Sequence, residues 1–319
     1  MRPRAVTLIA GGVGGAKMAE GFAALPDVAL SVIGNVADDA EFHGLWVSPD
    51  IDTLTYTLAG SIDRTQGWGV ADEGRRALET LASLGEDTWM FLGDRDFGLH
   101  IHRTARLRRG ERRATIAADI ARALGVVPRI ILPTDDIVQT HVRTDAGWLG
   151  FQEYFVRERC APDVREIVFD GMESARPTQE ALNAIGDADL IVIAPSNPLV
   201  SVAPILGVPG LRSAIADADA LCVAISPLIA GKVVKGPADR MLASLGHRQD
   251  AVGVAALYAD IADVMVIDGA DTELLPEIEA LGVKAQATDI LMRDAADKTR
   301  LAGKIMDTAN LMALEAATP

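Results

Sequence analysis

The sequence predicts an α/β protein built on a doubly wound, mostly parallel sheet. Three observations support this prediction. Short apolar runs alternate with helical patterns along most of the chain, a glycine-rich turn begins at Gly11, and residues 138–169 show alternating segments joined by turns. Buried strands that alternate with helices are typical of a parallel sheet covered on both faces. The expected fold is therefore Rossmann-like, with an inserted helical and antiparallel subdomain.

The predicted strands of the parallel sheet are short apolar runs. The first, residues 4–10, is too short for a signal peptide and ends at the glycine turn, so we interpret it as a strand. The others are residues 28–33, 89–92, 129–132, 190–194, 221–225, 264–267 and 283–287. Helical patterns lie between most of these runs or follow the last, at 17–25, 73–84, 178–185, 238–245 and 295–314.

A break in this alternation suggests the domain organisation. Residues 138–144, 147–153 and 163–169 have the pattern of antiparallel strands. We therefore expect residues 1–60 and 176–319 to form a nucleotide-binding core, and residues 61–175 to form an inserted cap subdomain. Because open parallel sheets bind ligands beyond the carboxyl ends of their strands, the functional side chains should lie in the loops that follow the strands.

Size, charge and cysteine content narrow the classes of partner. The 319 residues are 49% hydrophobic, enough for one large α/β domain or two smaller ones, and the formal net charge is -15. An acidic chain repels phosphate backbones and anionic lipids, so we expect small-molecule substrates and neither nucleic acid nor a membrane as partner. Cys160 and Cys222 have no paired spacing, which suits the reducing cytoplasm. No apolar run reaches the ~20 residues that a membrane span needs.

The first candidate site is the glycine turn, Gly11-Gly12-Val13-Gly14-Gly15-Ala16-Lys17. A strand, a glycine turn and a helix place backbone N–H groups and a helix N-terminus against a phosphate. The turn satisfies neither the dinucleotide fingerprint G-x-G-x-x-G nor the Walker sequence G-K-[ST]. It is either a tight connection without a ligand or a phosphate site of another kind, in which a nucleotide is bound by Gly11, Gly12, Gly14, Gly15 and Lys17.

Acidic residues concentrate after the second predicted strand. Five carboxylates fall within 15 residues, in Asp38-Asp39-Ala-Glu41 and in Ser48-Pro-Asp50-Ile-Asp52. Any one of them could cap a helix, but together they concentrate like charge, which costs free energy unless a cation or a proton neutralises it. Mg²⁺ takes one or two carboxylates alongside phosphate oxygens. We therefore expect a magnesium site among Asp38, Asp39, Asp50 and Asp52, with one aspartate accepting a proton from an attacking hydroxyl.

A third candidate is Leu92-Gly93-Asp94-Arg95-Asp96, which follows the predicted strand 89–92. Arg95 is either held by salt bridges to its neighbours or aimed as a fork at a phosphate or a planar ring edge. His100 and His102 follow on a predicted helix. Their spacing does not place them on one helix face, so they do not suggest a metal pair. One of them could contact a phosphate or be a buried histidine with satisfied hydrogen bonds.

Two further loops follow strands of the predicted core. Ala194-Pro195-Ser196-Asn197-Pro198 presents two polar side chains between prolines that fix the backbone, and Ser226-Pro227 follows the next strand in the same way. Each loop alone is ordinary turn chemistry. Together with the glycine turn they place several rigid polar loops at one edge of the sheet. This favours a nucleotide site to which Ser196, Asn197, Pro198 and Ser226 contribute.

These segments, in this order and spacing between residues 6 and 240, resemble the 2-phospho-L-lactate transferase family (CofD-type), which includes the phosphoenolpyruvate transferases of coenzyme F-420 biosynthesis. Gly67-Trp68-Gly69 and Phe151-Gln152 match as well. The resemblance implies that guanosine diphosphate linked to lactate, enolpyruvate or glycerate donates its phospho-acid to the ribityl hydroxyl of the deazaflavin Fo, releasing GMP. It also implies a magnesium cofactor and a homodimer.

The resemblance assigns roles by position. It implies that Asp52 and Arg95 bind Fo, that the glycine turn and residues 195–198 hold guanosine diphosphate, and that the metal region contains Asp38, Asp39 and Asp50. In the implied transfer, Asp52 or Asp39 takes the proton of the attacking hydroxyl. Arg95 would neutralise anionic oxygens as charge develops.

Two other functions stay open as alternatives. A nicotinamide-dependent oxidoreductase needs a complete G-x-G-x-x-G and an acidic residue after the second strand, where this chain has Asn35. A non-catalytic regulator of the CofD-like type would bind a sugar nucleotide through the same glycine turn. Such relatives lack the combined L-G-D-R-D and P-S-N-P segments, which this chain has. Detection of GMP after incubation with Fo, a guanylated donor and magnesium would separate a catalyst from a sensor.

Overall fold

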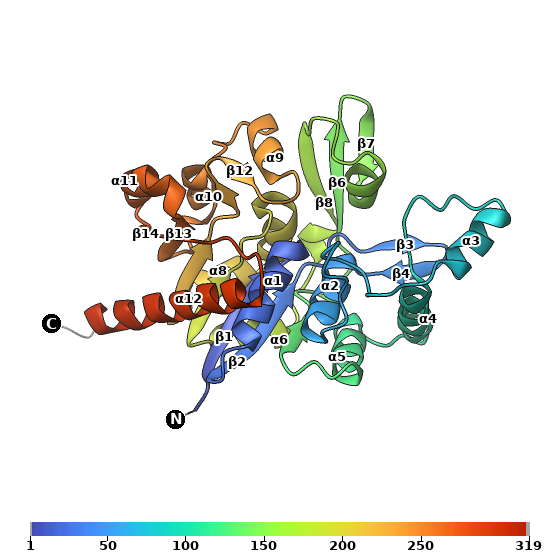
Figure 1. The fold of residues 1–319 in the computed structure, drawn as a ribbon, viewed down its shortest axis with the longest axis horizontal. Coiled ribbons are helices and arrows are strands. Elements are labelled where there is room, and N and C mark those ends of the chain that lie inside the picture. Colours follow the sequence, from blue (N-terminus) through green and yellow to red (C-terminus); the bar gives the residue numbers. More distant parts are fainter. Residues whose placement is uncertain (1, 317–319) are drawn as a thin grey trace.

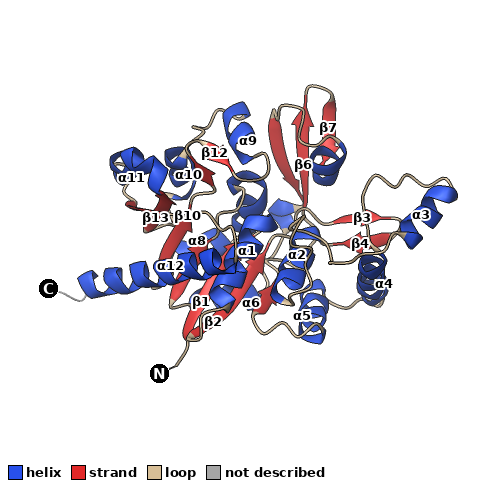
Figure 2. Cartoon of the chain, viewed as in Figure 1, coloured by secondary structure: helices blue, strands red, loops and turns tan. Residues whose placement is uncertain are grey.

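The computed structural model describes residues 2–316, and its centre is a seven-stranded sheet (Figures 1 and 2). The strand order is β14-β13-β10-β9-β1-β2-β5, and each neighbouring pair is parallel. Counted along the chain, this is the 3-2-1-4-5-6 order of a doubly wound sheet with one more strand at the end. The predicted fold class is confirmed.

The strands of the sheet lie close to the predicted ranges. They are β1 (Arg4–Ala10), β2 (Val28–Gly34), β5 (Arg129–Ile131), β9 (Leu190–Ile193), β10 (Leu221–Ile225), β13 (Val264–Asp268) and β14 (Lys284–Thr288). The predicted strand at 89–92 is wrong, because these residues have no strand partner. Leu92 is buried in a small cluster with Val47 and Phe97. This apolar run therefore reflects side-chain burial without the backbone pairing that defines a strand.

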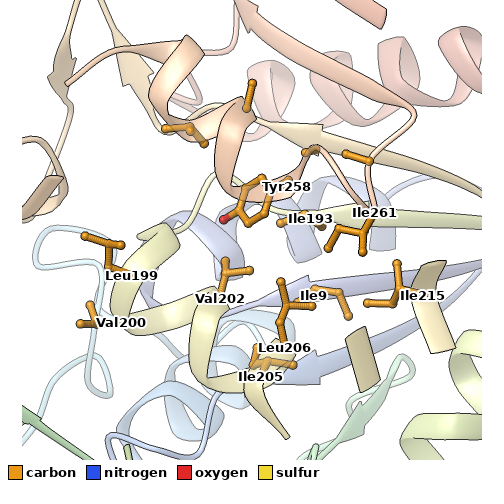
Figure 3. Close-up of a cluster of buried hydrophobic side chains, with 14 of the residues drawn as sticks. Ile9, Ile193, Leu199, Val200, Val202, Ile205, Leu206, Ile215, Tyr258 and Ile261 are labelled. Atoms are coloured by element: carbon orange, nitrogen blue, oxygen red, sulfur yellow. The ribbon is translucent and has the colours of Figure 1, made fainter. Parts of the chain in front are cut away.

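Helices cover both faces of the sheet. One face carries α1 (Gly12–Ala23), α2 (Pro49–Leu58), α5 (Arg113–Ala123) and α12 (Ala295–Ala316). The other carries α6 (Gln179–Gly186), η3 (Pro198–Val202), α7 (Ala203–Gly207), α8 (Leu211–Ala216), α9 (Ala238–Ser244), α10 (Ala251–Tyr258) and α11 (Leu275–Glu279). Figure 3 shows Ile9 and Ile193 of the sheet packed among side chains of this second face, including Tyr258. None of the helices among residues 2–316 is long and apolar enough to cross a membrane.

The chain between β2 and β9 adds structure outside the central sheet. The hairpin β3 (Ala40–Phe42) and β4 (Leu45–Val47) lies beside α4 (Asp94–Arg108), and α3 (Arg76–Ser83) packs near it, at the right of Figure 1. β6 (Gln139–Thr144), β7 (Gly147–Gly150) and β8 (Glu166–Asp170) form the antiparallel sheet that the pattern predicted. β7 ends at Gly150 rather than near residue 153, since a helical segment leading into η1 (Glu153–Arg157) begins at Phe151.

Two short stretches of the fold differ from the expected organisation. α1 begins at Gly12 rather than near residue 17, so the glycine turn is the first turn of a helix. β5 belongs to the central sheet although it lies within the segment 61–175, so that segment also supplies an edge strand to the core. The division of the chain into domains stays a prediction.

The remaining elements are the hairpin β11 (Leu228–Ile229) and β12 (Lys232–Val233) and the short helices η2 (Met172–Ser174) and η4 (Gly269–Leu274).

Candidate active site

A cavity of about 620 Å³ opens beyond the carboxyl ends of the central strands. It lies beside the boundary between β1 and β9, where the chain order of the sheet reverses and where doubly wound folds bind ligands. Most of the predicted site residues line it: Gly11, Gly12, Gly14, Lys17, Asp38, Asp50, Asp52, Ser196, Asn197 and Ser226. Gly15, Asp39, Arg95 and Pro198 do not.

The glycine turn is required because other segments approach its backbone closely. A Cβ on Gly14 would overlap the carbonyl oxygen of Pro195, and a Cβ on Gly11 would lie 2.8 Å from Asp50 Oδ2. Gly12 has a φ of +62°, which glycine adopts at little cost. The bare backbone therefore brings the N-terminus of α1 to the cavity wall, where its N–H groups are suited to an anion.

The polar side chains of the loops after β9 and β10 shape those loops. Ser196 Oγ donates to the carbonyl oxygen of Gly11 at 2.8 Å, which ties this loop to the glycine turn. Asn197 Oδ1 accepts from the N–H of Leu199 at 3.0 Å and caps η3. Ser226 Oγ accepts a backbone N–H within its own turn at 3.0 Å. These side chains hold the cavity edge in place as well as lining it.

Two lysines bring positive charge to the cavity. Lys17 Nζ donates to the carbonyl oxygen of Met292 at 3.0 Å, and both Lys17 and Lys235 line the cavity. Burial lowers the pKa of Lys17, and the ammonium groups of Lys298 and Lys235 lower it further. The negative charge of Glu20 opposes these shifts, and Glu20 also forms an ion pair with Lys298 at 2.6 Å. A bound anion would relieve the remaining repulsion between the ammonium groups.

Asp38 and Asp50 are the carboxylates that best fit a cation. Both are buried and line the cavity. Burial raises the pKa of Asp38 well above its ordinary value, and the neighbouring Asp50 carboxylate raises it further. Burial also raises the pKa of Asp50 to about 6, opposed by its hydrogen bond from Asn35 at 3.1 Å. Two buried like charges facing one cavity suit Mg²⁺, which takes one or two carboxylates and fills its shell with water and phosphate oxygens.

The number of side-chain ligands fits this mode of binding. Among residues 2–316, no three acidic, histidine or cysteine side chains are grouped as a metal centre. An ion held by Asp38 and Asp50 would therefore depend on oxygens from water and from a phosphate ligand, as Mg²⁺ sites in phosphoryl-transfer enzymes commonly do.

Asp39 was also predicted as a metal ligand, but it is paired with an arginine. Its Oδ2 accepts from Arg113, from Ser48 Oγ at 2.8 Å and from Trp46 Nε1 at 3.1 Å. Burial raises the pKa of Asp39, and Arg113 opposes that shift. Its Oδ1 is buried without a hydrogen-bond partner in the described part of the chain. Because Arg113 already balances its charge, Asp39 does not offer the uncompensated charge that Asp38 and Asp50 do.

Asp52 joins α2 to α4 through a buried arginine. Both terminal nitrogens of Arg103 donate to the two Asp52 oxygens, and Arg103 Nη1 also lies 3.1 Å from His100 Nδ1. Although burial lowers the pKa of Arg103, the Asp52 carboxylate holds it above its ordinary value. Tyr56 Oη donates to Asp96 Oδ1 at 2.7 Å, a second link between the two helices. This wall of the cavity is thus held by charged and polar contacts.

Arg95 is exposed and does not reach the cavity. Its Nη1 donates to the carbonyl oxygen of Ala71 at 3.1 Å, and its N–H donates to the Glu73 carboxylate at 2.8 Å. The flanking aspartates do not bind its guanidinium; Asp94 accepts from the N–H of Ala77 at the start of α3, and Asp96 bonds to Tyr56. The implied contact between Arg95 and Fo therefore stays a prediction.

Gly15 and Pro198 serve the packing beneath the cavity. A Cβ on Gly15 would lie 2.8 Å from the Cβ of Ala10 and 2.9 Å from Ser196 Oγ. Pro198 is buried at the start of η3. Both residues support the loops that line the cavity. Neither lines the cavity itself, so a ligand bound there would not contact them directly.

An aromatic wall was not assigned a role from the sequence. Trp68, Phe91, Phe151 and Phe155 line the cavity. The rings of Trp68 and Phe91 meet edge to face at 6.3 Å, and those of Phe151 and Phe155 stack at 5.6 Å. Phe151 and Phe155 lie four residues apart on the helical segment that includes η1, whereas Trp68 and Phe91 come from two other parts of the chain, so no single periodicity connects all four. The usable signal was their rarity, because only 4% of the residues are aromatic.

A doubly wound sheet whose glycine turn, lysines and paired carboxylates meet at one cavity is typical of the phosphate-binding class of α/β proteins. Comparison with known proteins identifies the family within this class. The model of the family described as "2-phospho-L-lactate transferase CofD" matches residues 6–306, and the chain belongs to this family.

The relatives agree with this assignment. The chain is 39% identical over 311 residues to a phosphoenolpyruvate transferase of Streptomyces griseus, covering 95% of this chain and 98% of the relative. It is 36% identical over 305 residues to a 2-phospho-L-lactate transferase of Methanopyrus kandleri, covering 94% and 96%. A solved structure of a Bacillus halodurans protein, 16% identical, shares the fold with a TM-score of 0.67 over 96% of this chain and 100% of that one.

These findings make the protein an enzyme: a transferase of the phosphoenolpyruvate or 2-phospho-L-lactate transferase type. The family implies a place in coenzyme F-420 biosynthesis. The resemblance seen in the sequence is confirmed.

Proposed function

We propose that the protein transfers a phospho-lactyl, phospho-enolpyruvyl or phospho-glyceryl group from a guanosine-diphosphate-linked donor to the ribityl hydroxyl of the deazaflavin Fo, releasing GMP. The observation that carries the proposal is one cavity lined by two chemically different sets of groups. The glycine turn, Lys17 and the acidic pair suit a diphosphate with its cation. The aromatic wall suits a planar ring.

The donor site would be organised by backbone and charge. The N–H groups at the start of α1 and the ammonium of Lys17 would contact phosphate oxygens. Asp38 and Asp50 would hold Mg²⁺, which when bound neutralises charge on the diphosphate. The protein's contribution is then mainly positioning and electrostatic stabilisation, as in other phosphoryl transfers.

In the proposed step, the oxygen of the ribityl hydroxyl forms a bond to the distal phosphorus of the donor. The bond between that phosphorus and the bridging oxygen breaks, and GMP leaves with the electron pair. The hydroxyl proton passes to a base. Of the two aspartates considered for this role, Asp52 lines the cavity and Asp39 does not, so we assign the role to Asp52, oriented by Arg103.

The test is a product assay. The protein is incubated with Fo, magnesium and an equimolar mixture of the three guanylated donors, and mass spectrometry measures GMP and the deazaflavin products. The proposal predicts GMP and product in equal amounts, and the product's mass identifies the acid. Sugar-nucleotide binding without GMP release would instead support a regulator, and NAD binding without GMP release would support an oxidoreductase.

We also propose, on the family resemblance, that the enzyme works in the cytoplasm as a homodimer on these small molecules. Sedimentation velocity tests the assembly: a dimer's mass at working concentration supports it, and a monomer's mass contradicts it. An acidic net charge of -15 agrees with small-molecule substrates rather than nucleic acid.

A further inference from the structure

His100 is a buried side chain of α4 that the proposed transfer does not use. It is 2% exposed and lines the cavity. Its Nδ1 lies 3.1 Å from Arg103 Nη1. A guanidinium carries only N–H donors, so Nδ1 must accept in this contact and has no proton of its own. The neutral ring therefore carries its single proton on Nε2.

The Nε2–H group is a donor without a protein partner. Nothing in the described chain, residues 2–316, accepts a hydrogen bond from it, while the ring itself borders the cavity. Burial lowers the pKa of His100 to about 4, a shift that Asp52 opposes and Arg103 reinforces, so the ring is neutral near pH 7. Asp39 Oδ1 is the one fully buried side-chain nitrogen or oxygen without a partner in the described chain, so Nε2 is open to the cavity. A ligand acceptor there would replace the water that this donor otherwise meets.

A hydrogen-bond acceptor lies on the Nδ1 side of the same ring. Asp52 Oδ2 lies 3.8 Å from His100 Nδ1, and Asp52 also lines the cavity. Each Asp52 oxygen receives one N–H from Arg103 and keeps a further lone pair for a ligand. Arg103 therefore fixes both the tautomer of His100 and the orientation of Asp52.

The chemistry of the pair selects a hydroxyl. A hydroxyl oxygen accepts one hydrogen bond and its hydrogen donates another, so it matches a neighbouring donor and acceptor. An ionised phosphate or carboxylate only accepts hydrogen bonds, so it could pair with the Nε2–H group but would offer nothing to Asp52. The glycine turn and Lys17, which line the same cavity, already provide for the anionic part of a substrate.

We infer that His100 is a binding residue for the polyol chain of the acceptor substrate, with Nε2–H donating to a hydroxyl oxygen while Asp52 receives a hydroxyl hydrogen of the same chain. Arg103 is the positioning residue for both. The inference rests on the proposed function, because the polyol chain in question is the ribityl group of Fo.

Two substitutions at His100 separate the pocket donor from the contact with Arg103. In His100→Gln the amide nitrogen reaches about as far as Nε2, whereas in His100→Asn the shorter amide reaches only the Nδ1 position and leaves the cavity without a donor. We expect His100→Asn to raise the KM for Fo about tenfold with the donor's KM unchanged, and His100→Gln to recover most of this loss. His102→Asn, on the exposed side of the same helix, is the control and should change neither constant.

Thermal unfolding of each variant accompanies the kinetics. An unchanged KM for Fo in His100→Asn would overturn the inference, as would a rise in the donor's KM alone. Parallel changes in both KM values together with a lower Tm would also overturn it, since they indicate a structural role. If the wild-type enzyme does not use Fo, the proposed function fails; if it does and His100→Asn matches it, only this inference fails.

Discussion

Buried acidic residues around the cavity fall into two groups. Asp39 binds the half-buried Arg113 and Asp52 binds the buried Arg103, so their charges are balanced within the protein. Asp38 and Asp50 have no arginine partner. Burial raises the pKa of both carboxyl groups, and the charge of Asp50 raises the pKa of Asp38 further. Because the second group stays uncompensated at the cavity surface, a cation bound there should stabilise the fold.

Replacing Asp50 tests this cation site. Mg²⁺ at about 100 times its Kd should stabilise the wild-type protein by about 2.7 kcal/mol, and Asp50→Asn should lose most of this gain because one of two ligands is removed. Without Mg²⁺, Asp50→Asn should be no less stable than wild type, since a buried like charge disappears. Thermal unfolding with and without Mg²⁺ measures both effects. The control is Asp219→Asn, an exposed carboxylate away from the cavity lining, which should keep the full response.

The same scans could contradict the assignment. If Mg²⁺ stabilises Asp50→Asn as much as wild type, the ion does not bind at this pair. If Asp219→Asn loses the response as well, the stabilisation comes from general screening of the acidic surface rather than from one site.

Asp96 should make stability depend on pH. Burial raises its pKa to about 6, opposed by the hydrogen bond from Tyr56. The folded state therefore holds this proton more tightly than the unfolded chain, so the contribution is present below about pH 4 and is lost as pH rises through about 6. The free energy of unfolding of wild type, measured in urea, should fall relative to that of Asp96→Asn between pH 4 and pH 7. Parallel curves for the two proteins would contradict this.

At the scale of elements, the glycines of the turn are explained by a close contact with a neighbouring loop and not by helix propensity. α1 includes Gly12, Gly14 and Gly15, although glycine is a poor helix former. Their lack of a side chain allows the loop at Pro195 to lie directly against the first turn of the helix. This close approach joins the ends of β1 and β9 into one cavity edge.

Gly14→Ala tests the need for that approach. The added methyl would overlap the Pro195 carbonyl oxygen, so we expect about 1–3 kcal/mol of destabilisation and weaker binding of GDP. Gly98→Ala is the matched control: it lies within α4, where a Cβ would meet no atom within 4 Å. It should be neutral or stabilising by up to about 1 kcal/mol. Equal stability and GDP affinity in Gly14→Ala and wild type would refute the argument.

The sequence predicted a strand correctly where an apolar run is both buried and paired with a neighbouring strand. Residues 221–225 were predicted as a strand and form β10 with these bounds. Residues 89–92 are equally apolar, but their side chains enter a local cluster and the cavity wall while the backbone pairs with nothing in the described chain. Arg95 is a similar case, because the residues around it in the sequence suggest a binding site. Its guanidinium instead donates to the carbonyl oxygen of Ala71 outside the cavity, a contact that the sequence does not reveal.

At the scale of the whole molecule, strand order decides which loops meet. The parallel pairing of Val6 with Leu190 places the loop after β9 beside the glycine turn. The sequence indicated that polar loops follow several strands, and a parallel sheet puts those loops at one edge. It could not indicate that residues 68–69 and 151–156, from the inserted part, complete the cavity with aromatic rings, because no local pattern records contacts between distant segments of the chain.

The central claim is that one cavity receives the diphosphate, its cation and the deazaflavin together. A crystal structure of the protein with GDP, Mg²⁺ and Fo tests this most directly. We predict the diphosphate against Gly12 and Gly14, the ion between Asp38 and Asp50, and the Fo ring against Trp68 and Phe91. Electron density that places Fo outside this cavity, or the diphosphate away from the glycine turn, would contradict the account.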